Sequence, residues 1–251
     1  MKEYGIIPAL AILLTAASAQ AGESFHDDFD RFDRSRWYVS DGWANGDWQN
    51  CQWSERAVRQ KDSMLTLSFT PGKSATHDYL CGEVQTRESY GYGTYEARLK
   101  TGKGSGLNAA FFSYIGPQQQ QPHDEIDVEI LLKDTSQVSL NTYVAGKPFN
   151  GGTAAIPPAD QGFNTYAFIW EPDRLRWFVN GKLVHEAADA DQLPITPQRI
   201  FFSLWGSDTL TDWMGPFTPP TEPVTMEVDW IAYTKASEPC RFPQSVLCGE
   251  L

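Results

Sequence analysis

Apolar and polar residues alternate in short segments along most of the chain, and this period of two predicts β-strands. The segments are rich in β-branched and aromatic residues, and clusters of Gly, Pro, Asn and Asp separate them. Only residues 186–192 are expected to form a short helix. The expected strands span residues 64–69, 93–99, 109–115, 125–132, 138–144, 166–170, 174–179, 200–205 and 224–233.

One hairpin is signalled by Asn180-Gly181, which lies between the strand at 174–179 and another at 182–186. Asn and Gly tolerate the positive φ that a two-residue hairpin turn requires. No composition break or long low-complexity linker divides the chain. Many short strands in an undivided chain are typical of a β-sandwich or barrel, and we expect one all-β domain over residues 22–251.

The first 21 residues are expected to lie outside this domain. Lys2 precedes an apolar run at 6–17, and Ala17-Ser18-Ala19 and Ala19-Gln20-Ala21 both place small residues at the spacing of a signal-peptidase site. A transmembrane anchor is the alternative, but the run is too short to cross a bilayer and no second one follows. The pattern predicts a secreted protein, extracellular or periplasmic, with no membrane attachment after residues 1–21 are removed.

The four cysteines are interpreted in the light of this export. An even number in an oxidising compartment favours two disulfides over a metal site, and no C-x-x-C spacing typical of zinc is present. Four cysteines allow three pairings. We expect nearest neighbours to pair, Cys51 with Cys81 and Cys240 with Cys248, each closure stabilising the fold by roughly 2.5–3.5 kcal/mol in the chain-entropy model.

The chain is acidic, with a formal net charge of −12 and a pI of about 4.7. A nucleic-acid-binding protein needs a concentrated basic face, and the sequence offers none. An acidic surface favours a soluble, monodisperse protein, so a monomer is expected. The same charge weighs mildly against a strongly anionic polymer as the substrate.

Aromatic residues are more numerous than one core of this size needs: nine Trp, ten Tyr and fourteen Phe. Flat aromatic side chains beside hydrogen-bonding residues suit pyranose rings, which have apolar faces and hydroxylated edges. Aromatic residues inside apolar strands are expected in the core, namely Phe168, Trp170, Trp177 and Trp230. Those among Gly, Asn and Asp are expected to be exposed platforms for sugar, namely Trp43, Trp48, Trp205 and Trp213.

The segment Glu125-Ile126-Asp127-Val128-Glu129 places three carboxylates at every second position. On a strand they share one face, while the branched apolar residues point the other way into a core. Burying three like charges in a dry interior would cost several kcal/mol each, so the acidic face must line a wet cleft. Paired carboxylates in a wet cleft are typical of glycoside hydrolysis.

The spacing of the two Glu residues constrains the shape of the sheet. Retaining glycosidases need carboxyl groups about 5–5.5 Å apart, but residues i and i+4 on a flat strand have Cα atoms about 13 Å apart. The strand must therefore curve so that Glu125 and Glu129 lean toward each other over Asp127. The like charge of Asp127 raises the proton affinity of its neighbours and helps to keep one Glu protonated as the acid.

Three other interpretations remain open. An exposed acidic strand face is common in soluble proteins, although three acids within so apolar a run are unusual. A divalent-metal site could use His123, Asp124 and the three acids, although calcium loops want Gly and flexible spacing. The segment could also belong to a carbohydrate-binding module that makes acidic contacts without catalysis.

At these residues the chain resembles glycoside hydrolase family 16, whose active-site strand carries E-x-D-x-E. The motif stands here in His123-Asp124-Glu125-Ile126-Asp127-Val128-Glu129-Ile130-Leu131. The resemblance extends over nearly the whole chain that follows the signal peptide. Further matching segments are Asp27-Asp28-Phe29, Gly91-Tyr92-Gly93-Thr94-Tyr95-Glu96, Phe111-Phe112-Ser113-Tyr114, Phe163-Asn164-Thr165-Tyr166-Ala167-Phe168, Ser203-Leu204-Trp205 and Asp229-Trp230-Ile231-Ala232-Tyr233.

The resemblance implies a concanavalin-like β-jelly-roll of two curved antiparallel sheets with a concave cleft. It also implies a retaining mechanism without a cofactor, in which Glu125 is the nucleophile, Glu129 the acid/base and Asp127 the helper between them. Cys51 and Cys81 match the disulfide of lichenases. Positions implied to bind substrate in the cleft are Asn45, Phe112, Tyr114, His123, Asn141, Tyr143, Trp205 and Trp213.

Asp229 matches a carboxylate that binds a structural Ca²⁺ in several members of the family, and an ordinary surface acid is the equal alternative.

The form of the motif indicates which branch of the family the chain resembles. It lacks the extra residue that laminarinase-type members carry before the last Glu, and His123 stands where lichenases carry Trp. Lichenases also carry Arg at Gln85 and Asn at Ser203. The chain is similar to bacterial endo-1,3-1,4-β-glycanases that process acidic exopolysaccharide such as succinoglycan. A xyloglucan-type transglycosylase or hydrolase is the alternative, and the Cys-containing tail at about 237–251 is absent from plain lichenases.

Overall fold

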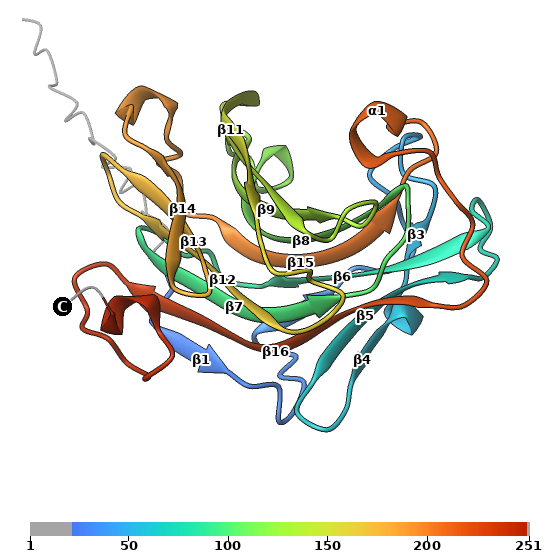
Figure 1. Cartoon of the computed structure of the whole chain (residues 1–251), viewed down its shortest axis with the longest axis horizontal. Coiled ribbons are helices and arrows are strands. Elements are labelled where there is room, and N and C mark those ends of the chain that lie inside the picture. Colours follow the sequence, from blue (N-terminus) through green and yellow to red (C-terminus); the bar gives the residue numbers. More distant parts are fainter. Residues whose placement is uncertain (1–21, 250–251) are drawn as a thin grey trace, which may run out of the picture.

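Strand β6 (Tyr79–Thr86) takes part in two sheets and joins them into one continuous strand order. Its first residues pair with β5 (Leu65–Pro71) and its later residues with β15 (Arg199–Gly206). The computed structural model describes residues 22–249, so the signal peptide expected at 1–21 lies outside the described residues. Two curved sheets pack against each other as a sandwich (Figure 1), which confirms the expected all-β fold class.

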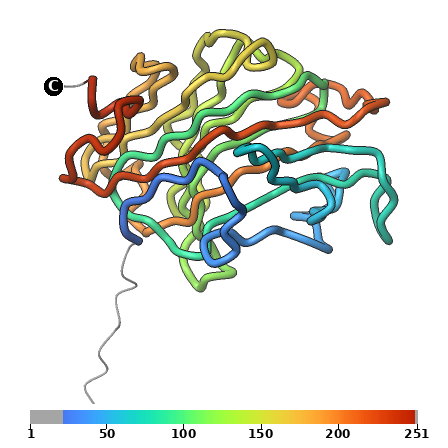
Figure 2. The backbone as a smooth tube through the Cα atoms, turned by 90° about the horizontal axis from the view of Figure 1, so that it is seen from below, coloured from blue at the N-terminus to red at the C-terminus, as the bar shows by residue number. Residues whose placement is uncertain are grey.

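Each of the two sheets has its own strand order, and β5 and β6 link them. The concave sheet has the order β11 (Lys147–Ala155), β10 (Gln137–Val144), β9 (Asp124–Leu131), β8 (Leu107–Ile115), β15 and β6, with β2 (Trp37–Val39) also on β6. The second sheet has the order β5, β16 (Val224–Lys235), β7 (Gly93–Thr101), β12 (Asn164–Trp170), β13 (Leu175–Val179) and β14 (Lys182–Ala187). Figure 2 shows β16 running between β7 and β5.

Short elements complete the sandwich. Strand β1 (Phe25–Asp27) pairs with β16, β4 (Val58–Gln60) with β5, and the two-residue β3 (Gln52–Trp53) runs parallel to β6. The helical turns are η1 (Glu55–Ala57), η2 (Pro117–Gln119), η3 (Ala190–Gln192), α1 (Thr211–Met214) and η4 (Val246–Cys248). Within residues 22–249 no helix has the length and apolar character needed to span a membrane.

Each expected strand coincides with an observed one, but the expected short helix is wrong. Residues 186 and 187 instead end β14, because Ala187 pairs with Leu175 of β13. Only residues 190–192 turn helically, as η3, whose first turn is capped by the Asp189 side chain accepting from the Asp191 backbone N–H. The pairing with a neighbouring strand therefore overrides the local helical preference.

Two long strands, β6 and β11, were not expected from the sequence. β6 contains Gly and Glu, and β11 contains Lys, Pro, Asn and two Gly, all residue types that are depleted in strands. β6 is nevertheless buried along almost its whole length because it has neighbours in both sheets. β11 is an edge strand, where a single ladder with β10 suffices.

The hairpin predicted at Asn180-Gly181 is confirmed. Both residues adopt positive φ, 50° and 73°, as a two-residue turn between β13 and β14 requires. The Asn180 Oδ1 accepts the Thr165 backbone N–H at 2.8 Å, and its Nδ2 donates to the Asn164 Oδ1 at 2.7 Å. These bonds fasten the turn to β12.

The apolar face of β9 packs in the core between the sheets. Ile126, Val128 and Ile130 are at most 2% exposed and belong to the same cluster as Trp177 of β13. The Trp177 Nε1 donates to the backbone carbonyl of Asp127 at 3.1 Å. Each buried aliphatic side chain stabilises the fold by about 1.5–3 kcal/mol, so the acidic strand is anchored from beneath.

The aromatic residues expected in the core are buried. Phe168, Trp170 and Trp177 are fully buried between the sheets. Trp230 is also buried, but on the face of β16 that points away from this core, where its ring packs against His26 and Phe242.

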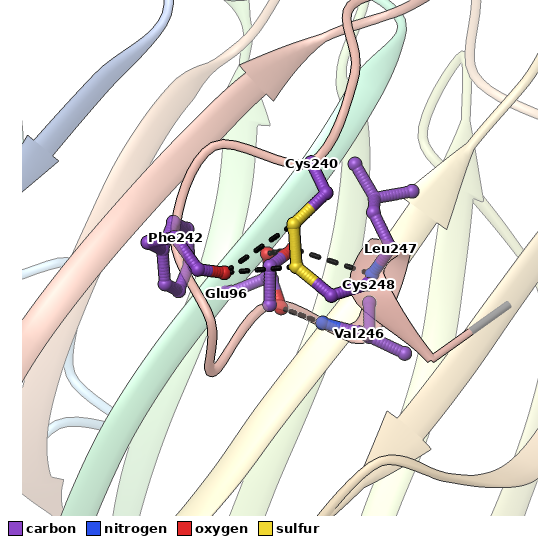
Figure 3. The surroundings of a disulfide bond; sticks show 7 residues. Glu96, Cys240, Phe242, Val246, Leu247 and Cys248 are labelled. Carbon is purple, nitrogen blue, oxygen red and sulfur yellow. Dashed lines mark hydrogen bonds between the residues drawn. A yellow bond between two sulfur atoms is a disulfide. The ribbon is translucent and has the colours of Figure 1, made fainter. Parts of the chain in front are cut away.

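Both nearest-neighbour cysteine pairs form disulfides in the structure. Cys51 and Cys81 join the segment before β3 to β6, with Cα atoms 5.8 Å apart. Cys240 and Cys248 close the tail loop after β16. This loop covers Glu96 of β7, as Figure 3 shows.

The tail satisfies a carboxylate that would otherwise be stranded. Glu96 is fully buried, and burial raises its pKa. The Ser245 Oγ donates to one carboxyl oxygen at 2.7 Å, and the Val246 backbone N–H donates to the other at 2.7 Å. The tail disulfide therefore holds these two donors over a group that is costly to bury alone.

Candidate active site

The three acidic side chains of β9 lie on the floor of the concave sheet. Residues directly opposite one another on neighbouring strands share a face, so the register shows what surrounds each acid. Glu125 lies opposite Tyr114 and Tyr143, Asp127 opposite Phe112 and Asn141, and Glu129 opposite Ala110 and Ser139. Each acid is thus flanked by one side chain from β8 and one from β10.

A cleft of about 1760 Å³ lies over this floor. It extends across the sheet from β11 to β2, with α1 also contributing to its wall. All catalytic and substrate-binding residues expected from the sequence line it, namely Asn45, Phe112, Tyr114, His123, Glu125, Asp127, Glu129, Asn141, Tyr143, Trp205 and Trp213. The structure brings them together, while their individual roles stay predictions.

The curvature that the carboxylate spacing demands is present. Strands β8 and β15 bend along their length with the concave side toward the cleft (Figure 1). β9 pairs with β8 over eight residues, from Asp124 to Leu131, and follows this bend. A concave strand tilts side chains on its inner face toward one another, which favours the approach of Glu125 to Glu129.

The tryptophans expected as exposed platforms divide into two groups. Trp43 and Trp48 are 41% and 38% exposed, as expected, and both line the cleft. The expectation that Trp205 is exposed was wrong: it is 8% exposed within β15, packed by Trp48 at 4.9 Å and Trp213 at 6.1 Å between ring centroids. Trp213, on α1, is half-buried. Trp205 belongs to the core cluster and to the cleft wall at once.

Burial and like charge favour the protonated form of Asp127. The pKa of Asp127 is raised well above its usual value, first by burial, then by the charges of Glu125 and Glu129 and by a hydrogen bond with Glu125. A neutral Asp127 relieves the repulsion between the two Glu side chains. It can also donate a hydrogen bond to a neighbouring carboxylate.

Glu129 is poised to donate a proton near neutral pH. Burial raises its pKa to about 7, the Asn108 hydrogen bond lowers it, and the charge of Glu125 raises it. The Asn108 Nδ2 donates to Glu129 Oε1 at 2.7 Å from a fully buried position on β8. A carboxyl with a pKa near the working pH suits general acid and base catalysis. Asn108 was not expected from the sequence, because its contact spans 21 positions.

Glu125 is held by an imidazole. The His123 Nε2 lies 2.6 Å from Glu125 Oε2, and the ring stacks on Tyr143 at 4.9 Å and meets Tyr114 edge-on at 5.2 Å. The hydrogen bond with Glu125 is the first cause that raises the pKa of His123, and burial opposes it. The two Glu residues therefore have different partners: Glu125 is hydrogen-bonded to an imidazole, and Glu129 to the Asn108 amide.

The residues considered for a metal ion are engaged otherwise. Asp124 points at backbone, accepting the Ala145 N–H at 3.0 Å and the Thr196 N–H at 3.4 Å. The Asp229 carboxylate pairs with the Arg98 guanidinium. Between residues 22 and 249 no group of three or more His, Cys, Asp or Glu could hold a metal ion. The Ca²⁺ site at Asp229 that the resemblance implied stays a prediction.

Several cleft residues were missed by the sequence analysis. They lie on β2, β6 and the start of β15, and they are Tyr38, Glu83 and Arg199. Glu83 is buried, its pKa is raised to about 7 by burial, and it accepts a hydrogen bond from Ser40 Oγ at 2.5 Å. These residues were missed because the sequence did not predict β6, the strand that contains Glu83 and that pairs with both β2 and β15.

Comparison with known proteins gives consistent matches. The chain matches the family described as Glycosyl hydrolases family 16 over residues 45–232. It is 54% identical to the endo-1,3-1,4-beta-glycanase ExoK of Rhizobium meliloti (strain 1021), with 90% of this chain and 84% of the relative covered. It is 35% identical to a beta-glucanase of Bacillus subtilis (strain 168), with 92% of this chain and 94% of the relative covered.

A solved structure, a Bacillus licheniformis beta-glucanase, superposes with a TM-score of 0.81 at 35% identity and covers 86% of this chain and 100% of that chain.

Proposed function

Because the chain belongs to glycoside hydrolase family 16, it is an O-glycoside hydrolase, and we propose that it cleaves internal β-glucosidic bonds of a 1,3-1,4-linked glucan or exopolysaccharide. The observation that carries the proposal is the row of Glu125, Asp127 and Glu129 on the floor of the cleft. The linkage type is supported by the 54% identity to an endo-1,3-1,4-beta-glycanase.

The proposed reaction proceeds in two displacements with retention at the anomeric carbon. In the first, Glu125 forms a bond to the anomeric carbon, the glycosidic C–O bond breaks, and Glu129 gives its proton to the departing oxygen. In the second, a water oxygen attacks the same carbon, its proton passes to Glu129, and the bond to Glu125 breaks. Glu129 returns to the protonated form in which it began.

The protonation states in the cleft support this division of roles. Glu129, with its pKa raised to about 7, carries the proton that the first step consumes. Glu125 is bonded to His123, which stabilises the carboxylate as it attacks and as it departs. The raised pKa of Asp127 between them favours its neutral form, which keeps a third negative charge away from the reacting centre. No step needs a cofactor.

The shape of the cleft supports attack within a polymer chain. The cleft reaches over strands on both sides of β9, so sugar units on either side of the cleaved bond find protein surface. Trp43 and Trp48 offer exposed aromatic faces on the β6 side of the acids. Aromatic faces stack on the apolar faces of pyranose rings.

Two finer features of the proposal concern context. The substrate is proposed to be a 1,3-1,4-glucan or an acidic exopolysaccharide such as succinoglycan, and residues 1–21 are proposed to direct secretion. Detection of a mature protein that begins near residue 22 in the culture medium or periplasm would test the export step.

The decisive experiment compares wild-type protein with Glu125→Ala and Glu129→Ala on lichenan, xyloglucan, laminarin and succinoglycan. Each substitution removes one member of an obligatory pair and should lower turnover by several orders of magnitude. Azide should rescue Glu125→Ala and give an α-glycosyl azide, because a small anion replaces the missing nucleophile.

NMR of the first wild-type products should show the β-anomer. An initial α-product would refute the assigned roles. A folded and fully active Glu125→Ala protein would leave only a binding function for these acids, and products longer than the substrate would indicate transglycosylation.

A further inference from the structure

One part of the cleft carries positive charge in a protein whose net charge is −12. Arg87 and Arg199 are the only Lys or Arg residues that line the cleft within residues 22–249. Arg199 lies at the start of β15, and Arg87 directly follows β6. The other charged residues that line the cleft are four acids, Glu83, Glu125, Asp127 and Glu129. The two arginines therefore form a basic pair in an otherwise acidic cleft.

The position of the pair follows from the sheet register. Tyr114 lies opposite Glu125 on one side and opposite Arg199 on the other, so Arg199 is two strands away from Glu125 in the same row. Neighbouring strands are about 4.8 Å apart, which places the two backbones about 10 Å from each other. Gln85 lies opposite Phe201, so Arg87 continues this row one strand further.

Neither arginine is neutralised by an acid. No Asp or Glu of residues 22–249 lies within salt-bridge distance of Arg87 or Arg199. The Arg199 Nη1 donates to Gln85 Oε1 at 2.9 Å, and the Arg87 Nε donates to the Arg34 backbone carbonyl at 2.9 Å. Both partners are neutral and leave other guanidinium N–H groups available.

Their environment concentrates positive charge. Burial lowers the pKa of the half-buried Arg199, and the charge of the nearby Arg87 lowers it further. The Arg87 guanidinium also lies over the Tyr38 ring, 5.6 Å from its centroid, which orients it. Two like charges held side by side without a counter-ion form a site that an anion stabilises.

We propose that Arg87 and Arg199 bind a carboxylate carried by the polysaccharide, at a sugar held on the β6 side of the cleaved bond. This inference rests on the proposed function and specifies its substrate as an acidic β-glucan. Guanidinium groups match the planar carboxylate with paired hydrogen bonds. The two arginines supply positive charge where the anionic group of the substrate binds, although the protein as a whole is negatively charged.

The test uses a matched pair of substrates. A 1,3-1,4-β-glucan is compared with the same glucan in which a small fraction of the C6 hydroxymethyl groups is oxidised to carboxylate. The readout is the ratio of kcat/KM on the oxidised polymer to kcat/KM on the parent polymer. This ratio should fall about tenfold in Arg199→Gln and about threefold in the more exposed Arg87→Gln.

Three controls separate charge from structure. Arg199→Lys retains the charge and should recover much of the ratio. Arg59→Gln removes one positive charge from an exposed position on β4, outside the cleft, and should leave the ratio unchanged. Raising the salt concentration from about 0.01 M to about 0.5 M should lower the wild-type ratio, because ions screen an exposed contact.

The outcomes are distinguishable. If Arg87→Gln and Arg199→Gln both keep the wild-type ratio at low salt, the inference is overturned. If the wild-type protein hydrolyses neither polymer, the proposed function fails, and titration with oxidised oligosaccharide still decides the inference: wild-type protein should bind it more tightly than Arg199→Gln, and equal affinities would overturn the carboxylate site.

Discussion

Replacement of Asn108 by Ala should move the pH profile of the enzyme without removing any reacting group. The Asn108 side chain donates to Glu129 at 2.7 Å, and this bond is the one contribution that lowers the pKa of Glu129 against burial and the charge of Glu125. A hydrogen bond to a charged group contributes about 1.5–3 kcal/mol. One pH unit corresponds to about 1.4 kcal/mol. The pKa of Glu129 should therefore rise by about 1 to 2 pH units in Asn108→Ala.

The sign of the effect on activity is set by the role of Glu129. In the proposed mechanism the first step needs Glu129 protonated, so activity should be lost as pH rises through its pKa. For the wild-type protein this loss should be centred at about pH 7. In Asn108→Ala the alkaline limb of kcat/KM should lie about 1 to 2 pH units higher, while the acidic limb, which reports a different group, stays in place.

The assay is initial-rate hydrolysis of lichenan across the pH range, with circular dichroism to show that each variant is folded. Ser139→Ala is the matched control, because Ser139 lies opposite Glu129 on the other neighbouring strand and makes no hydrogen bond to it among residues 22–249. Its alkaline limb should coincide with that of the wild type. An unshifted alkaline limb in folded Asn108→Ala would refute the assignment of Glu129 as the acid or of Asn108 as its partner.

Other expected outcomes concern binding and stability. Trp48→Ala should weaken substrate binding with little change in Tm, because the side chain is 38% exposed. Trp170→Ala, which removes a fully buried side chain, should cost roughly 3–5 kcal/mol of stability. Equal losses of Tm would contradict the cleft position of Trp48. Substituting Cys240 and Cys248 by Ser should lower the free energy of unfolding by about 2–3 kcal/mol, and calorimetry should show no loss if the tail does not restrain the fold. In the folded protein the pKa of Glu83 is raised from 4.5 to about 7, so the unfolded chain loses this proton at a lower pH than the folded one. The free energy of unfolding should therefore fall as pH rises between these two values, by about 3 kcal/mol for a difference of about 2.5 pH units. Glu83→Gln should flatten that part of the stability curve in urea titrations, and an unchanged curve would show that Glu83 is not the group responsible.

Much of the candidate site could be predicted because its chemistry lies on one strand. The shared face of Glu125, Asp127 and Glu129 is a local consequence of the period of two in β9, which no tertiary contact needs to supply. The turn at Asn180-Gly181 is equally local. The position of His123 beside Glu125 could be inferred from its place just before the strand.

Residues brought in by other strands were harder to predict. Trp205 ends an expected strand, and Gly206 and Asp208, which follow it, led to the expectation that it is exposed. It is buried because β8 extends the sheet past it and because Trp213 of α1 packs on it. Arg199 and Arg87 are more than 100 positions apart in the sequence and meet only through the pairing of β15 with β6. β6 itself was not expected, because its Gly and Glu residues disfavour a strand unless neighbours on both sides pair with it.

The sequence alone therefore determined which residues share a strand face, where one chain reversal occurs and which three carboxylates lie together on one face, because covalent geometry fixes side-chain alternation within a strand. The tertiary structure decided which strands neighbour one another, and with them the pKa of Glu129, the burial of Trp205 and the basic pair in the cleft. These properties depend on desolvation and on distances between side chains that are remote in the sequence. They exist only once the concave sheet has been assembled.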